Sequence, residues 1–131
     1  MNLPSNPLSR SNPIAFVATA DRDRARAFYA ETLGLPVLAE DDFAVTFRMG
    51  EGGTTMRLTA VPGHQPLPHT VLGWAVDDVR GAVAALRGKG VTFNVYEGLG
   101  QDADGIWQAP GGARVCWFPD PDGNVLSLTQ F

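Results

Sequence analysis

The sequence predicts an α+β fold built from two βαβββ modules. Three observations support this: strand-like and helix-like segments occur in the same order in both halves of the 131-residue chain, the two helical segments have the same length, and a proline-rich stretch separates the halves. We therefore expect one domain over residues 13–131, formed by modules 13–61 and 70–131 and a linker at 62–69. A loose N-terminal lead, residues 1–12, precedes it.

The first module begins with the largely apolar run 14–20, which is typical of a buried strand. Asp21 then offers a carboxylate to the free amides of a first helical turn, and Gly34 ends the helix. One apolar face is expected at helical spacing, from Ala25, Phe28, Tyr29 and Leu33. Further strands are expected at 36–39, 43–49 and 55–61, with Glu51 and two glycines as the turn between the last two.

The second module repeats this order. A strand at 71–76 leads into a helix that begins at Asp77 and Asp78 and ends at Gly90. Its apolar face is expected from Val79, Val83 and Leu86, and later strands from 91–96, 106–108, 113–118 and 125–128. The chain advances by 13 residues from Asp21 to Gly34 and again from Asp77 to Gly90. This repetition indicates an internal duplication.

Composition and charge exclude several classes of partner. The net charge of -4 lacks the basic excess that would attract a nucleic acid or an anionic membrane. No segment approaches the roughly 18 uninterrupted apolar residues of a spanning helix, and prolines interrupt the N-terminus where a signal peptide would need an apolar run. Cys116 is the only cysteine, so no internal disulfide is possible. We expect a cytoplasmic protein with no nucleic-acid or membrane partner.

The last hairpin carries a resemblance to a known family. Asp120-Pro-Asp-Gly123 lies between two short apolar strands, and the helix cap, Phe28-Tyr29 and Leu33-Gly34 precede it in order. This pattern resembles the vicinal oxygen chelate superfamily of glyoxalase I, bleomycin-resistance proteins and extradiol dioxygenases, from about Pro13 to Phe131. The resemblance implies curled mixed sheets around a concave cavity, with one helix per module on the outer face, and a homodimer.

The resemblance also implies where a metal ion would bind. In metal-dependent members the first strand of each module gives a histidine or glutamine and the last gives a glutamate. Here those positions hold Ile14, Arg57, Val71 and Ser127. Two are aliphatic, a guanidinium stays protonated and repels a cation, and a neutral hydroxyl is no substitute for a carboxylate. We expect no metal ion and no cofactor.

A different strand register leaves one alternative for a metal site. Slipping a strand by one residue exchanges its two faces, and His69 lies two residues before Val71 with the same parity. His69 is therefore kept as a weak candidate ligand, with His64 nearby and Glu97 or Asp102 as acids. The alternative for both histidines is that they are solvated groups of a proline-rich linker.

Ligand binding without a metal would depend on polar groups of the concave face. Arg57 suits the carboxylate, phenolate or phosphate of a small ligand, because its fork of N–H groups binds such anions in a bidentate manner. It is equally able to pair with an internal carboxylate or to reach water. Thr59 and Ser127 share these faces and offer hydroxyls to a ligand. The alternative for Ser127 is that it fills space and bonds to backbone or water.

Aromatic residues form a second group of candidates. Phe16, Phe47 and Phe118 are expected to line the cavity, and Trp107 to lie at its mouth after the glycine-rich loop 98–105. The alternative is that these rings belong to the core, and Trp107 and Phe47 are the two favoured as ligand neighbours.

Other conspicuous side chains are expected to be structural. Trp74 and Trp117 have the parity expected to face the helices. Cys116 falls on the concave side of its strand, but no neighbouring base would lower its pKa, so an inert thiol is expected. Asp102 and Asp104 have the chemistry of a turn rather than of a cation site.

Two functions follow as hypotheses, and a third possibility is that side chains fill the cavity and the domain serves in dimerisation or regulation. The first is a metal-free binding protein that sequesters a small, partly aromatic or anionic organic molecule, as the resemblance to bleomycin-resistance proteins implies. The second is an enzyme, a lyase, isomerase or dioxygenase, that uses a shifted metal site or metal-free acid–base chemistry. The four missing ligands favour the first and leave the identity of the ligand open.

Overall fold

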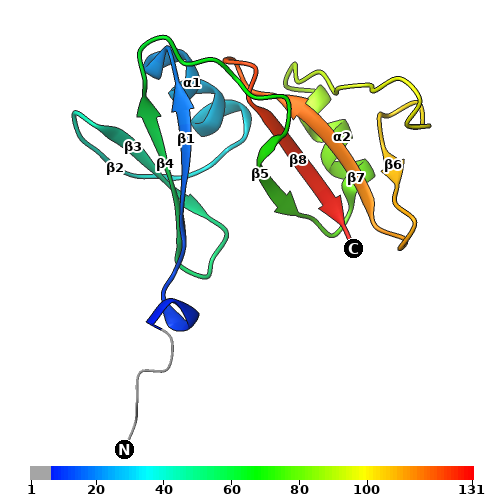
Figure 1. Cartoon of the computed structure of the whole chain (residues 1–131), viewed down its shortest axis with the longest axis horizontal. Coiled ribbons are helices and arrows are strands. Elements are labelled where there is room, and N and C mark those ends of the chain that lie inside the picture. The colour runs from blue at the N-terminus through cyan, green and yellow to red at the C-terminus, as the bar shows by residue number, and fades with distance from the viewer. Residues whose placement is uncertain (1–6) are drawn as a thin grey trace, which may run out of the picture.

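Two four-stranded mixed sheets, each with a helix on one face, make up the protein in this computed structural model, which describes residues 7–131 (Figure 1). The strand orders are β1-β4-β3-β2 and β5-β8-β7-β6, so the sheets have the same topology. In each, the first strand runs parallel to the last and the other neighbours are antiparallel. The predicted α+β fold of two βαβββ modules is confirmed.

The first module contains four strands and one helix that changes its winding. Its elements are β1 (Ile14–Thr19), α1 (Arg22–Ala27), the π-helical turn η2 (Phe28–Thr32), β2 (Val37–Glu40), β3 (Ala44–Met49) and β4 (Thr54–Ala60). A 3-10 turn, η1 (Pro7–Arg10), precedes them within the expected N-terminal lead. Residues 1–6 of that lead lie outside the described residues.

The second module has the same plan. Its elements are β5 (Thr70–Ala75), α2 (Val79–Arg87), β6 (Trp107–Gln108), β7 (Arg114–Pro119) and β8 (Val125–Gln130). Asp21 caps α1 by accepting a hydrogen bond from the amide of Arg24 at 3.1 Å, and Asp78 caps α2 through the amide of Gly81 at the same distance. Of the two aspartates predicted to begin the second helix, Asp78 is the cap.

The predicted strand at 91–96 does not form. Only Asn94 bonds to the neighbouring strand there, through its amide to the carbonyl of Trp117 at 2.8 Å. The side chain of Gln101 accepts from the amide of Tyr96 and donates to the carbonyl of Asn94. Side-chain hydrogen bonds therefore satisfy backbone groups that a strand ladder would otherwise pair, and β6 takes the edge position.

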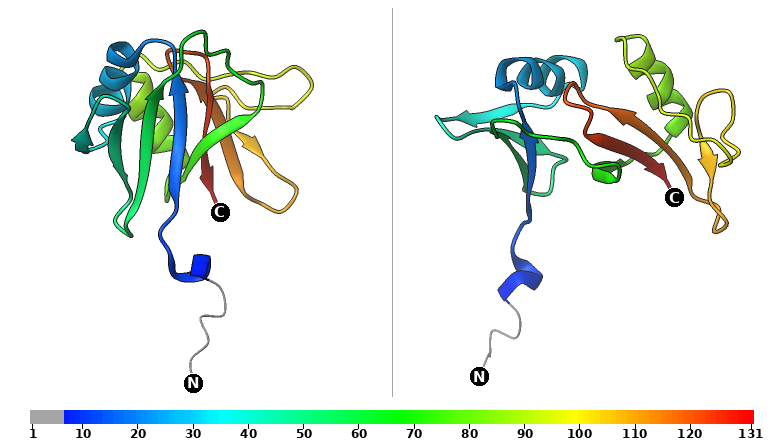
Figure 2. Two further views of the ribbon diagram at one scale, coloured as in Figure 1. Left: turned by 60° about the vertical axis from the view of Figure 1, so that its left-hand side comes forward. Right: turned by 45° about the horizontal axis from the view of Figure 1, so that its top comes forward.

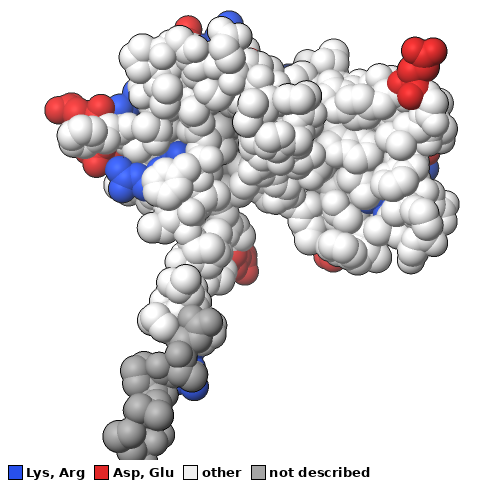
Figure 3. All heavy atoms as spheres, in the orientation of Figure 1, with Lys and Arg blue, Asp and Glu red and all other residues white. Residues whose placement is uncertain are grey.

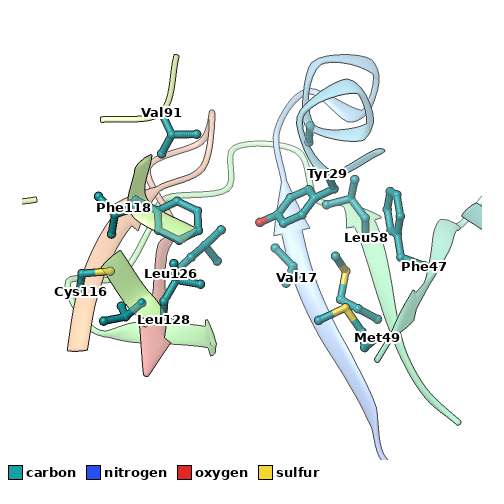
Figure 4. Close-up of a cluster of buried hydrophobic side chains, with 14 of the residues drawn as sticks. Val17, Tyr29, Phe47, Met49, Leu58, Val91, Cys116, Phe118, Leu126 and Leu128 are labelled. Carbon is teal, nitrogen blue, oxygen red and sulfur yellow. The ribbon is translucent and has the colours of Figure 1, made fainter. Parts of the chain in front are cut away.

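The core lies between the strands and the helices. Along the central strands buried residues alternate with less buried ones, as with Met56 and Leu58 of β4 and Leu126 and Leu128 of β8. Figure 4 shows Leu58, Leu126 and Leu128 in the core. The two helices lie on one side of the strands (Figure 2). We call the opposite side of each sheet its open face. This face is seen in Figure 3, where charged side chains gather at its ends and few lie over its middle.

The C-terminal hairpin turn joins the two modules. The Tyr29 hydroxyl, which points toward the second module in Figure 4, donates to Oδ2 of Asp120 at 2.6 Å. The amide of Ala20 donates to Asp122 at 2.8 Å, and the Arg24 guanidinium donates to the carbonyl of Pro121 at the same distance. Burial, together with the Asp120 charge and hydrogen bond, raises the pKa of Tyr29 far above its ordinary value. The phenol therefore stays protonated and remains the donor.

No helix among residues 7–131 is long and apolar enough to span a membrane.

Replacing Tyr29 with phenylalanine removes the donor without changing the ring. We expect Tyr29→Phe to lower the free energy of unfolding by about 1–3 kcal/mol, because the buried Asp120 carboxylate loses a hydrogen bond. Urea denaturation followed by circular dichroism measures this difference. The control is Tyr96→Phe, whose hydroxyl is exposed and which should change stability by less than about 0.5 kcal/mol. Equal effects of the two substitutions would contradict the assignment.

Candidate functional site

Two rows of side chains cross the open faces at equivalent places in the two modules. In the first module Phe16 of β1, Arg57 of β4 and Thr46 of β3 are neighbours in register. In the second module the corresponding row joins Gly73 of β5, Ser127 of β8 and Trp117 of β7. Each row contains one predicted site residue of a last strand, Arg57 or Ser127. The duplication therefore places these two side chains at matching points of two similar surfaces.

These surfaces do not offer the ligands of a metal centre. Ile14 and Val71, the expected first-strand positions, are 54% and 39% exposed aliphatic side chains. No group of three His, Cys, Asp or Glu among residues 7–131 is arranged to hold a metal ion. Of the two acids proposed for a shifted site, Asp102 is instead bonded to Arg80 at 3.0 Å, and Glu97 is exposed, as is His69. The residues present do not fit the metal that the resemblance implies.

Arg57 has an internal partner, Asp41, but this ion pair leaves part of its guanidinium free to bind another group. Its Nη2 lies 3.6 Å from Oδ2 of Asp41, and the two side chains are 35% and 57% exposed. The backbone amides of Phe43 and Ala44 are the main cause of the lowered pKa of Asp41, and the charge of Arg57 contributes less. An ion pair this long and this exposed is weak in water. The guanidinium keeps N–H groups available to an external anion.

Ser127 is closely packed against its neighbour. A Cβ atom at Gly73 would collide with Oγ of Ser127, so the hydroxyl occupies the space that the glycine leaves open. This contact explains why a residue without a side chain faces Ser127 across β5 and β8. The arrangement agrees with the space-filling alternative for Ser127.

An aromatic cluster covers part of the second open face. The ring of Trp117 lies 5.5 Å from that of Tyr96 and 6.1 Å from that of Trp107, measured between centroids. Trp117 was predicted to face the helices, and that prediction is wrong. The hairpin pairs Trp117 with Ser127, and directly paired residues point to the same side of a sheet. Counting the pairs outward from the Asp-Pro-Asp-Gly turn would have revealed this.

Three other side chains also lie in the core, two of them through the same register of β7. Cys116 and Phe118 are fully buried on the helix side, where Phe118 stacks on Trp74 with centroids 6.5 Å apart. Phe47 is also fully buried, 6.0 Å from the ring of Tyr29. Neither phenylalanine lines the open face as predicted, and Cys116 does not lie on it. Trp74 faces the helix side, as expected.

A cleft of about 170 Å³ lies where the two open faces meet, between β1 and β5. Its walls are formed by Phe16, Val17, Ala18, His64, Leu67, Val71 and Asn124. It brings together Phe16 and Val71, which belong to different modules and lie 55 positions apart in the sequence. Thr59 is the register partner of Ala18 at its edge.

His64 lines this cleft, whereas the sequence predicted for it only a place near a shifted metal site or in solvent. It is half-buried, and its Nε2 lies 2.8 Å from Oδ1 of Asn124. The linker had indicated a solvated histidine, and no local signal marks this one, because its partner lies 60 positions further along the chain.

The chain matches a known protein family over most of its length. The sequence model of the Glyoxalase/Bleomycin resistance protein/Dioxygenase superfamily matches residues 10–128. A search of curated protein sequences found no significant match.

Solved structures with the same fold are numerous. A member of this superfamily from Sphaerobacter thermophilus is 25% identical with a TM-score of 0.74, covering 92% of this chain and 97% of its own. TnmS3, an antibiotic binding protein from a Streptomyces species, is 25% identical with a TM-score of 0.66, covering 92% and 94%. A lactoylglutathione lyase from Agrobacterium tumefaciens, at 17% identity and a TM-score of 0.70 over 92% and 93%, shares the fold.

The buried thiol gives a prediction about reactivity. Burial raises the pKa of Cys116 to about 11, so only a small fraction is thiolate near neutral pH. We expect a disulfide reagent such as DTNB to modify the folded protein at about pH 8 at least 100-fold more slowly than free cysteine. Guanidinium chloride at a denaturing concentration should restore the full rate. A fast reaction of the folded protein would show that Cys116 is accessible.

Proposed function

Because the chain belongs to the glyoxalase/bleomycin resistance protein/dioxygenase superfamily, we propose that it binds a small, partly aromatic, anionic organic molecule on its open faces without a metal ion. The observation that carries the proposal is that the open faces hold an exposed guanidinium, Arg57, in the first module and an aromatic cluster, Trp107, Trp117 and Tyr96, in the second. The guanidinium occupies a position where the resemblance would place a glutamate ligand.

The aromatic cluster suits the planar part of such a ligand. Its two tryptophans are half-buried, with rings inclined by 33°, and Tyr96 meets Trp117 edge-on at 80°. Contacts between these rings fix their orientation before a ligand arrives. A fixed aromatic surface loses little side-chain entropy on binding a flat molecule.

Cationic side chains suit the anionic part. Arg48 extends from the open face of β3, next to Thr55 of β4 in register, and makes no ion pair among residues 7–131. Together with Arg57 it gives the first open face two guanidinium groups, of which only Arg57 has a carboxylate beside it in the described part of the chain. A carboxylate or phenolate is attracted to such a pair.

Relatives support a binding role. TnmS3, at 25% identity, is an antibiotic binding protein. The likeness to the lyase, at 17% identity, extends to the fold alone. The four expected ligand positions hold no metal-binding set, which favours the binding role over the family's metal chemistry.

A second copy of the chain is proposed to complete the site. Phe16 and Ile14, next to each other on the open face of β1, are 66% and 54% exposed. Apolar side chains of this size that adjoin one another are typical of covered surfaces. We propose a homodimer in which the partner covers β1 and encloses the ligand, as the resemblance implies.

An anionic probe and its neutral analogue distinguish the contribution of Arg57 from that of the aromatic cluster. We expect calorimetric titration to show saturable binding of 2-naphthoate and weaker binding of the neutral 2-naphthamide. Arg57→Met should weaken 2-naphthoate binding about 5–10-fold and leave 2-naphthamide unchanged, because only the carboxylate uses the guanidinium. Trp117→Ala should weaken both probes by a similar factor.

The matched control is Arg114→Met. Arg114 is also exposed, but it has the parity of Cys116 and so lies on the helix side of β7. Loss of binding after dialysis against EDTA, with recovery on adding a divalent metal, would overturn the metal-free proposal. Equal effects of Arg57→Met and Arg114→Met would remove Arg57 from the site.

A further inference from the structure

A chain of hydrogen bonds runs from the first helix to the cleft. The Tyr29 hydroxyl donates to Oδ2 of Asp120, and Nδ2 of Asn124 donates to the same oxygen at 2.9 Å. Asp120 and Asn124 are 4% and 3% exposed. Asn124 in turn meets His64, whose ring lines the cleft. The buried side chains of Asp120 and Asn124 therefore fix the position of the imidazole on the side away from the cleft.

These contacts determine the tautomer of the neutral imidazole. Nδ2 of Asn124 donates twice, to Asp120 and to the carbonyl of Ala18, both at 2.9 Å. Since both amide hydrogens are used, the atom that faces His64 is the amide oxygen, an acceptor. Nε2 of His64 must then carry the hydrogen. This leaves Nδ1 with a free lone pair, because a neutral imidazole has one donor and one acceptor nitrogen.

Nδ1 is a polar atom, without a protein partner among the described residues, in a mainly apolar cleft. Within residues 7–131 it has no hydrogen-bond partner, and it is not among the side-chain atoms enclosed by the protein. The walls around it are mainly Phe16, Leu67 and Val71. The volume of about 170 Å³ is close to the ~150 Å³ of an apolar cavity that accepts benzene.

We propose that His64 recognises a ligand group that donates a hydrogen bond, such as a phenolic hydroxyl, through its Nδ1 atom. The cleft would take one ring of the ligand, with its donor directed at His64 and its apolar edge against Phe16 and Val71. This inference rests on the proposed binding function and adds a specificity-determining residue to it. Asp120 and Asn124 act as positioning residues, because they orient the imidazole but do not themselves accept the hydrogen bond of the ligand.

Phenol and anisole test the inference, since they share a ring and an oxygen but only phenol donates a hydrogen bond. We expect the wild-type protein to bind phenol about 5–10-fold more tightly than anisole, as one hydrogen bond to a neutral partner allows. NMR titration that follows the resonances of Phe16 and Val71 measures both affinities and shows whether each probe enters the cleft.

Two variants isolate the acceptor atom. His64→Phe keeps the ring and removes both nitrogens, whereas His64→Asn places an amide oxygen near the former Nδ1. Both variants lose the bond from Nε2 to Asn124, so their difference reports on the acceptor alone. We expect the preference for phenol to vanish in His64→Phe and to remain within about 3-fold of wild type in His64→Asn. His69→Phe, in the same linker but exposed, is the control and should leave the preference unchanged.

The outcomes separate this inference from the proposed function. An unchanged preference for phenol in His64→Phe would overturn the role of His64. If neither phenol nor anisole perturbs Phe16 and Val71 while 2-naphthoate still binds, the cleft proposal fails and the proposed function stands. If no probe binds, both fail. A long-range nitrogen–proton spectrum of the neutral imidazole that shows the hydrogen on Nδ1 would also overturn the inference.

Discussion

The buried carboxylate of Asp120 is the group on which the arrangement of the two modules depends. It accepts four hydrogen bonds, from the Tyr29 hydroxyl, the amides of Asp122 and Asn124, and the side chain of Asn124. An unpaired carboxylate would be costly to bury, so these donors must all be in place when the chain folds. Because one donor comes from the first module and three come from the hairpin turn, the same residue shapes the turn and docks it. The motif that marks the family in the sequence thus serves as the junction of the fold.

Identical topology carries different chemistry in the two halves of the site. The first open face presents guanidinium groups, while the second presents aromatic rings and a small residue pair, Gly73 and Ser127. Both surfaces arise from alternating residues of equivalent strands, whose other side is committed to the core. Substitutions on the open faces leave the buried residues untouched. This separation explains how residues of the open faces can differ from those of relatives while the duplicated fold is retained.

Features of the candidate site that depend on short-range sequence patterns were predictable. Features that depend on how the strands pair were not. The helices, their capping aspartates, the module order and the chemical character of Ile14 and Val71 follow from short-range spacing. The orientation of β7 does not, because a shift of one residue exchanges Trp117 with Phe118 between the open face and the core. The segment 91–96 likewise has strand-like composition, yet Gln101 supplies hydrogen bonds that replace a ladder. In both places the deciding partner lies outside the segment itself.

The sequence by itself determined the duplicated architecture and the absence of family metal ligands at four positions, since residue identity and spacing along the chain suffice for both. The tertiary structure alone decided which aromatic rings reach the open face, and that His64 lies at the cleft held by Asn124. These features depend on contacts between residues of different elements. Asn124 lies 60 positions from His64, and Asp120 lies 91 from Tyr29. Local spacing in the sequence does not reveal contacts between residues so far apart, because hydrogen bonds and packing between the modules bring them together on folding.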